Sequence, residues 1–203
     1  KCLLMKNNSR WNIPGGYIGR NESVDEASKR VLKDLTGVQL DNLRLLSVFG
    51  NANRNFRDQF KGLAKEHRIK WDPNNWLNSR FVSIGYYALV NINDVIVKGN
   101  DFYDEIRWID IEDLVDMNLD HKEIIHSSVS RLRADINDGR TCHELLPNPF
   151  TMPDLHQLHQ IILQKEIDRS RFQKKMIGSG KFHRLPQSKT PSPGRNPYLY
   201  TPV

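Results

Sequence analysis

The chain is 38% hydrophobic and 27% charged, a composition that excludes an intrinsically disordered protein. Its 203 residues can form one large domain or two modest ones. It has no apolar run near the ~20 residues that cross a bilayer, so we expect no membrane contact. Residues 141–203 hold nine Lys or Arg and four Asp or Glu, and thus nearly all of the net charge of +6. They either contact a polyanion or form a solvated basic surface.

The first fifty residues predict a strand, a helix and a second strand. Residues 3–6 are typical of a strand end, and this abrupt start leads us to expect native sequence before Lys1. After a turn and a short extended piece broken by Pro14, apolar residues recur at helical spacing: Val24, Ala27, Val31 and Leu35. Gly37 is typical of a helix C-cap, and residues 43–49 predict the second strand.

The middle of the chain continues this α+β pattern around one long interruption. Residues 81–90 are apolar and aromatic and give the strongest strand signal. Residues 105–109 predict another strand, and residues 121–137 predict a helix. The polar residues 51–80 form an insertion between two strands, with a short helix near residues 57–66.

Only two cysteines are present, Cys2 and Cys142, and they form no CxxC pair. This excludes a disulfide framework and a cysteine-based zinc site. It also fits the reducing environment of the cytoplasm, which is the localisation we expect.

The segment from Gly16 to Val38 resembles the Nudix box. That family's pattern is Gly, five residues, Glu, seven residues, and then Arg-Glu-apolar-x-Glu-Glu-x-Gly-apolar. Six positions are in register: Gly16, Glu22, Arg30, Leu32, Gly37 and Val38. The lead-in Trp-Asn-Ile-Pro-Gly-Gly at residues 11–16 also matches. The resemblance implies a Nudix-like α/β/α sandwich over residues 1–140.

The box lacks most of the carboxylates on which Nudix catalysis depends. In the family they share one helical face and hold Mg²⁺, which stabilises the pyrophosphate and helps to activate water. The equivalent positions here are Val31, Asp34 and Leu35. Apolar side chains cannot ligate a metal, so we predict no catalytic residue, no metal site, no cofactor and no enzyme activity. The alternative is rescue by carboxylates of the insertion: Asp58, Glu66 and Asp72.

The cleft of such a domain can still bind a small ligand, because function resides in the site and not in the scaffold. The candidate effector-binding residues belong to the box and its lead-in: Trp11, Tyr17, Glu22, Arg30 and Asp34. Arg30 and Glu22 have a structural alternative that we favour, in which they pair and brace the loop. For Trp11 and Tyr17 we favour a place in the core.

Residues 141–203 predict a winged helix-turn-helix domain. The capping box of Thr151 and Asp154 begins the first of two short helices, and its first turn tolerates Pro153. Asp168 can cap a second helix over residues 169–177, and two short helices joined in this way form a helix-turn-helix. Strands near residues 181–185 and 198–200 enclose a basic loop and predict the wing.

The second of these helices predicts a basic outward face. Phe172 and Met176 lie four residues apart and would face the core, which turns the polar residues outward. Arg, Lys, Gln and Ser bond base edges and phosphates in the major groove. The predicted DNA-binding residues of helix and wing are Arg169, Ser170, Arg171, Gln173, Lys174, Lys175, Lys189 and Arg195. A winged helix that contacts a protein instead is the alternative.

The two domains together resemble the bacterial Nudix-related transcriptional regulators of the NrtR and AraR type. Besides the box, the matching segments are residues 82–89, 119–125, 145–147, 150–151 and 168–172. The resemblance covers nearly the whole chain, and the 51–80 insertion departs from it. It implies a homodimer on a two-fold symmetric double-stranded DNA operator.

The resemblance also implies a small-molecule effector that shifts DNA affinity, either a pentose such as L-arabinose or a nucleotide sugar such as ADP-ribose. Two other functions stay open. One is a Nudix pyrophosphohydrolase with residual Mg²⁺-dependent activity on a nucleoside diphosphate derivative. The other is a protein-interaction adaptor whose winged helix binds no DNA.

Overall fold

The computed structural model describes residues 1–7, 10–41, 43–66, 68, 70–95, 97, 103–187 and 197–203. The chain divides into two compact units. The first unit consists of Lys1–Ala88 and Ile96–Val129, and the second consists of Leu89–Val95 and Ser130–Val203. Helix α3 (His121–Asn137) contributes residues to both. The domain boundary at residue 140 stays a prediction.

The first unit contains two antiparallel sheets. In one, β1 (Cys2–Asn7) lies between β2 (Arg10–Asn12) and β5 (Glu105–Ile109). In the other, β3 (Arg44–Phe49) pairs with β4 (Ser83–Tyr87). Strands β1, β3, β4 and β5 were predicted within a few residues at their ends, whereas the segment of β2 was predicted only as a short extended piece. One core cluster of buried residues packs on the first sheet: Leu4, Trp11, Ile109, Met117 and Ile125.

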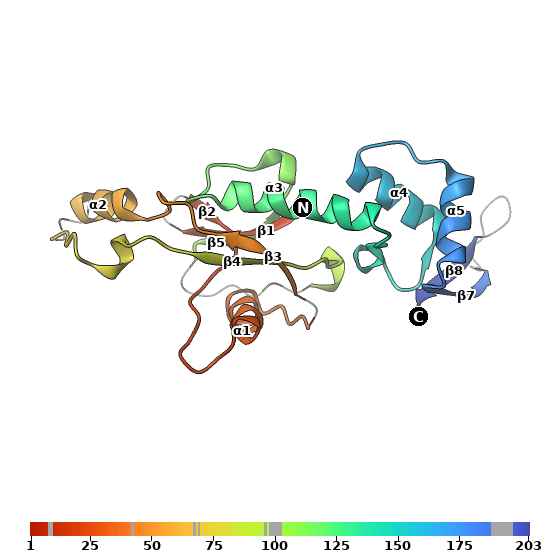
Figure 1. Ribbon diagram of the computed structural model, residues 1–203, viewed down its shortest axis with the longest axis horizontal. Helices are drawn as coiled ribbons and strands as arrows, with labels where there is room; N and C mark the ends of the chain where they lie inside the picture. The colour runs from red at the N-terminus through yellow and green to blue at the C-terminus, as the bar shows by residue number, and fades with distance from the viewer. Residues whose placement is uncertain are drawn as a thin grey trace. The chain divides into compact units, whose positions relative to one another are not determined.

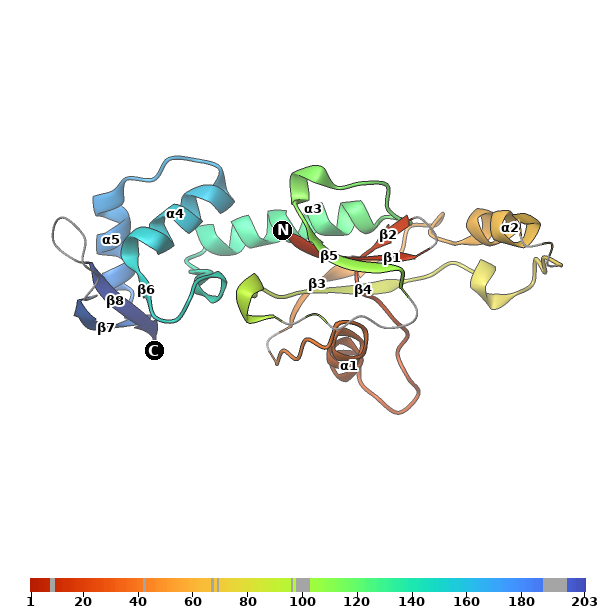
Figure 2. The same cartoon turned by 180° about the vertical axis from the view of Figure 1, so that it is seen from behind.

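Helices cover both sides of these strands, with α1 (Val24–Thr36) on one side and α3 on the other (Figures 1 and 2). This confirms the predicted α/β/α sandwich. A capping box of Ser23 and Glu26 begins α1, and Gly37 ends it with φ 73°, a left-handed conformation that suits glycine. The hydroxyl of Tyr86 in β4 donates to Asp25 at 2.5 Å and so attaches α1 to the second sheet.

The insertion forms α2 (Arg57–Glu66) and a short 3-10 helix (Trp76–Asn78), so the short helix predicted there is confirmed. None of the helices in the described part of the chain is both long and apolar enough to cross a membrane.

The second unit contains the predicted winged helix-turn-helix. Its elements in chain order are β6 (Phe150–Thr151), α4 (Met152–Leu163), α5 (Arg169–Gly178), β7 (Phe182–Gln187) and β8 (Tyr198–Pro202). The strands form an antiparallel sheet in the order β6, β8, β7. Thr151 and Asp168 cap the two helices as predicted. The buried core consists of Phe150, Met152, Leu155, Phe172, Met176 and Tyr200.

Candidate functional site

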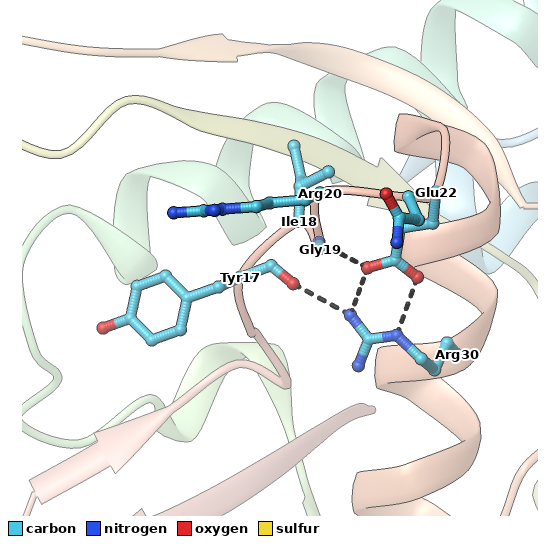
Figure 3. Close-up of a pocket in the computed structure, with 7 residues that line it drawn as sticks. Tyr17, Ile18, Gly19, Arg20, Glu22 and Arg30 are labelled. Atoms are coloured by element: carbon cyan, nitrogen blue, oxygen red, sulfur yellow. Dashed lines mark hydrogen bonds and ion pairs between the residues drawn. The ribbon is translucent and has the colours of Figure 1, made fainter.

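The side chain of Arg30 in α1 holds the loop that precedes this helix (Figure 3). Its guanidinium forms a forked pair with Glu22, with Nε 2.8 Å from Oε2 and Nη2 2.6 Å from Oε1. Nη2 also donates to the carbonyl oxygen of Tyr17 at 2.9 Å. The N–H of Gly19 donates to Oε1 of Glu22 at 2.6 Å. These hydrogen bonds fix residues 17–22 against the helix.

The same hydrogen bonds favour the ionised form of Glu22. Those from Arg30 and from the N–H of Gly19 lower the pKa of Glu22 to about 2, because donors stabilise a charged carboxylate. On the exposed surface of α1, Asp34 lies 3.5 Å from Nη1 of Arg30. The pairing of Arg30 with Glu22, which the sequence offered as the structural alternative, is therefore the arrangement observed.

An open hollow of about 450 Å³ lies beside this loop and is lined by Tyr17, Ile18, Gly19, Arg20, Asn21, Glu22 and Arg30. The side chain of Tyr17 is 61% exposed, so the core position that we favoured for it is wrong. Arg30 holds the carbonyl oxygen of Tyr17 in a loop that leaves its side chain beside the open hollow. Trp11 is 5% exposed and packs in the core, as favoured, so its placement does not support an effector contact.

The residues of the box do not fit a magnesium ion. Val31 occupies a metal-ligand position of the family and packs so tightly on Gly16 that a Cβ there would lie 2.8 Å from its Cγ2. The carboxylates of Glu22 and Asp34 already face Arg30. Across the described part of the chain, no three His, Cys, Asp or Glu side chains gather as metal ligands. The box thus lacks the set of oxygen ligands that Mg²⁺ requires.

Two residues beside the hollow were not predicted as site residues. Arg20 lines it and extends from the loop in the same direction as Tyr17 (Figure 3). Trp76 of the insertion contacts the ring of Tyr17 edge to face, with ring centroids 5.3 Å apart. The place of Arg20 inside the box could have indicated it. The contact of Trp76 joins residues that are distant in sequence, so no local pattern indicates it.

A second candidate site is the exposed face of α5. Phe172 and Met176 are buried, as their spacing predicts. The polar residues predicted to contact DNA all face solvent: Arg169, Ser170, Arg171, Gln173, Lys174 and Lys175. Because α5 contains no Asp or Glu, its exposed polar residues from Arg169 to Lys175 form a basic face. The predicted wing contacts, Lys189 and Arg195, lie outside the described residues.

Two histidines of α4 hold α5 in place. The rings of His156 and His159 contact the ring of Phe172, with centroids 5.2 Å and 5.0 Å apart. Nε2 of His159 lies 2.6 Å from the carbonyl oxygen of Thr141, and Nε2 of His156 lies 2.7 Å from that of Ile167. Burial lowers the pKa of His159, which favours its neutral ring. These contacts fix the direction in which α5 presents its basic face.

Comparison with known proteins found a family model that matches most of the second unit. Residues 142–201 match the family model of the NrtR DNA-binding winged helix domain. A curated relative from Acinetobacter baylyi, described as an ADPR responsive transcriptional repressor, is 24% identical over 185 residues. The match covers 89% of this chain, and the chain spans only 65% of that relative's length.

Structural and enzymatic relatives were also found. The structure of Shewanella oneidensis NrtR is 22% identical and matches with a TM-score of 0.75, covering 99% of this chain and 86% of that one. The same protein in complex with a 27mer DNA matches with a TM-score of 0.73 at 21% identity, over 99% and 85% of the two chains. These matches show the fold. An RNA pyrophosphohydrolase from Bartonella clarridgeiae is 22% identical over 120 residues, which cover 59% of this chain and 67% of the enzyme.

Proposed function

We propose that this chain, which is similar to the Nudix-related proteins of the NrtR type, is an effector-responsive transcriptional regulator. Its winged helix binds operator DNA, and its Nudix-like unit binds a small ligand without turnover. The observation that carries this proposal is the basic, acid-free exposed face of α5 within the segment that matches a DNA-binding domain.

On the DNA side, α5 enters the major groove with the six polar side chains of its exposed face. Arg171 and Gln173 suit base edges, whereas Lys174 and Lys175 suit phosphates. Two copies of the chain bind the two halves of a symmetric operator, so that the half-site spacing follows from the distance between two α5 helices.

On the ligand side, the effector is ADP-ribose. The curated relative is described as ADPR responsive, and the hollow beside the braced loop offers the guanidinium of Arg20 to a phosphate. Arg30 and Glu22 act by holding the loop, since they are bonded to each other. The effector changes DNA affinity if it binds one arrangement of the dimer better than the other.

The test is binding of the purified protein to its own upstream DNA, measured by fluorescence anisotropy while ADP-ribose or L-arabinose is titrated. We expect retention of DNA that weakens steeply with salt, and a change in affinity with ADP-ribose. Arg171→Ala should reduce DNA binding, whereas Ile177→Ala on the same exposed helix should not. No DNA retention even at low salt would refute the regulator and leave the adaptor function.

The second candidate function is residual pyrophosphohydrolase activity, favoured by the retained box residues and by the similarity to an RNA pyrophosphohydrolase. Its test is Mg²⁺-dependent cleavage of ADP-ribose by the unmodified protein, followed by chromatography. We expect intact ADP-ribose, because two of the three carboxylate positions are apolar. Steady release of AMP and ribose 5-phosphate above a buffer control would instead establish an enzyme.

A further inference from the structure

Four aromatic side chains form a cluster beside the hollow: Tyr17, Phe56, Trp76 and Phe81. The ring of Phe81 contacts the other three, at centroid distances of 6.3 Å to Tyr17, 5.5 Å to Phe56 and 6.2 Å to Trp76. The residues Tyr17 and Trp76 nevertheless stay 61% and 58% exposed. We call these two rings the aromatic platform.

The platform is held in place although it faces solvent. Tyr17 belongs to the loop that Arg30 braces through the carbonyl oxygen of Tyr17 itself. Trp76 lies in the 3-10 helix of the insertion, and Nδ2 of Asn78 in that helix donates to the carbonyl oxygen of Asp72 at 2.7 Å. Rings positioned in advance lose little freedom when a planar ligand stacks on them.

The positively charged side chain of Arg20 lies next to the platform. Arg20 and Tyr17 line the same hollow, and their side chains extend from the loop in the same direction (Figure 3). Arg30 is bonded to Glu22, whereas Arg20 has no hydrogen bond or ion pair among the described residues. A guanidinium of this kind binds phosphate oxygens with two parallel hydrogen bonds.

We propose that the insertion completes a nucleotide-binding site, in which a nucleobase stacks on the exposed ring of Trp76, meets the ring of Tyr17 with its edge, and places its phosphates toward Arg20. This inference rests on the proposed function and names the part of the ligand that the insertion recognises. A flat ring with attached phosphates matches both features, whereas a free pentose has no charge to place against Arg20. The insertion therefore selects a nucleotide sugar over a simple sugar.

The experiment measures binding of ADP-ribose and of ribose 5-phosphate by calorimetry. Replacing a stacked ring by Ala costs ~1–3 kcal/mol, so Trp76→Ala should weaken ADP-ribose about tenfold and leave ribose 5-phosphate unchanged. Trp76→Phe should keep most of the affinity because it keeps an aromatic face. Arg20→Ala should weaken both ligands. Val48→Ala, an exposed apolar change on β3, is the control and should weaken neither.

Equal affinity of Trp76→Ala and the wild type for ADP-ribose would overturn the proposal, as would a wild type that binds L-arabinose but not ADP-ribose. Melting temperatures of the variants show whether a loss of affinity reflects unfolding. DNA binding is measured on the same proteins, so that failure of the stacking site can be distinguished from failure of the proposed regulator function. DNA release by a pentose alone would keep the regulator and remove the stacking site. Loss of ADP-ribose affinity in Trp76→Ala, in a protein that binds no DNA, would keep the stacking site and remove the regulator.

Discussion

Arg54 donates from Nε to both carboxylate oxygens of Asp120, at 2.8 Å and 3.0 Å, and both side chains are largely buried. Nη1 of Arg54 also donates to the carbonyl oxygen of Phe81 at 3.4 Å, and the N–H of Phe81 donates to that of Arg54 at 2.9 Å. Residue 54 lies near the start of the insertion, and residue 81 directly follows its end. The pair therefore joins both ends to each other and to the residue that precedes α3.

Arg54→Met should lower the free energy of unfolding by about 3–5 kcal/mol, because it leaves the carboxylate of Asp120 buried without its partner. Urea denaturation measures this change. Lys29→Met is the matched control, since Lys29 pairs with Asp41 on the surface at 3.6 Å and should contribute less than about 1 kcal/mol. Similar losses of unfolding free energy for the two variants would show that the buried pair contributes no more to stability than the surface pair.

The contact of Gly16 with Val31 predicts a coupled pair of substitutions. Gly16→Ala places a methyl group 2.8 Å from Cγ2 of Val31, and such overpacking costs about 1–3 kcal/mol. Val31→Ala removes the obstructing methyl groups, so Gly16→Ala should cost much less in that background. A double-mutant cycle of unfolding free energies measures the coupling. Strict additivity would mean that the loop moves away from the helix instead.

The helices were predictable because their signals are local. Ser23, Thr151 and Asp168 begin helices and Gly37 ends one, each within one turn of the apolar stripe, so a short window of sequence suffices. The burial of Phe172 and Met176 followed from their spacing for the same reason.

The site was less predictable because it depends on contacts between distant residues. The box correctly indicated the pairing of Arg30 with Glu22, which is fixed within one loop and helix. The contact of Tyr17 with Trp76 arises only when the insertion folds beside the loop, and no pattern close to Tyr17 reports that it is exposed. The bond between Arg54 and Asp120 joins residues 66 positions apart, and no periodicity reports such a pair.

Two substitutions in α5 should separate stability from DNA binding. Phe172→Ala removes a buried ring that packs on His156 and His159, and should cost about 3–5 kcal/mol in unfolding free energy. Lys174→Ala changes an exposed residue and should alter stability by less than about 0.5 kcal/mol. It should still weaken DNA binding, and a lost phosphate contact reduces the slope of log affinity against log salt by about 1. An unchanged slope would place Lys174 away from the DNA backbone.

His121, the first residue of α3, predicts that stability falls with acidification. Burial and the nearby charge of Arg54 lower the pKa of His121 to about 4, although Asp120 opposes the shift. An unfolded histidine has a pKa near ~6.5, so between these values the unfolded chain binds the extra proton. The contribution of the neutral ring is therefore complete above pH ~6.5, declines as the pH falls, and is lost near the folded pKa.

Denaturation at pH 7.5 and pH 5 measures this effect. The wild type should lose about 1–2 kcal/mol more between the two pH values than His121→Gln, whose side chain does not titrate. Lys122→Gln removes a charge from the exposed neighbouring position and should keep the wild-type difference. His159, whose pKa burial also lowers, lies in the second unit and leaves a remaining pH dependence in every variant. If His121→Gln and the wild type lose the same stability, the pKa of His121 in the folded protein is not lowered, and the prediction is wrong.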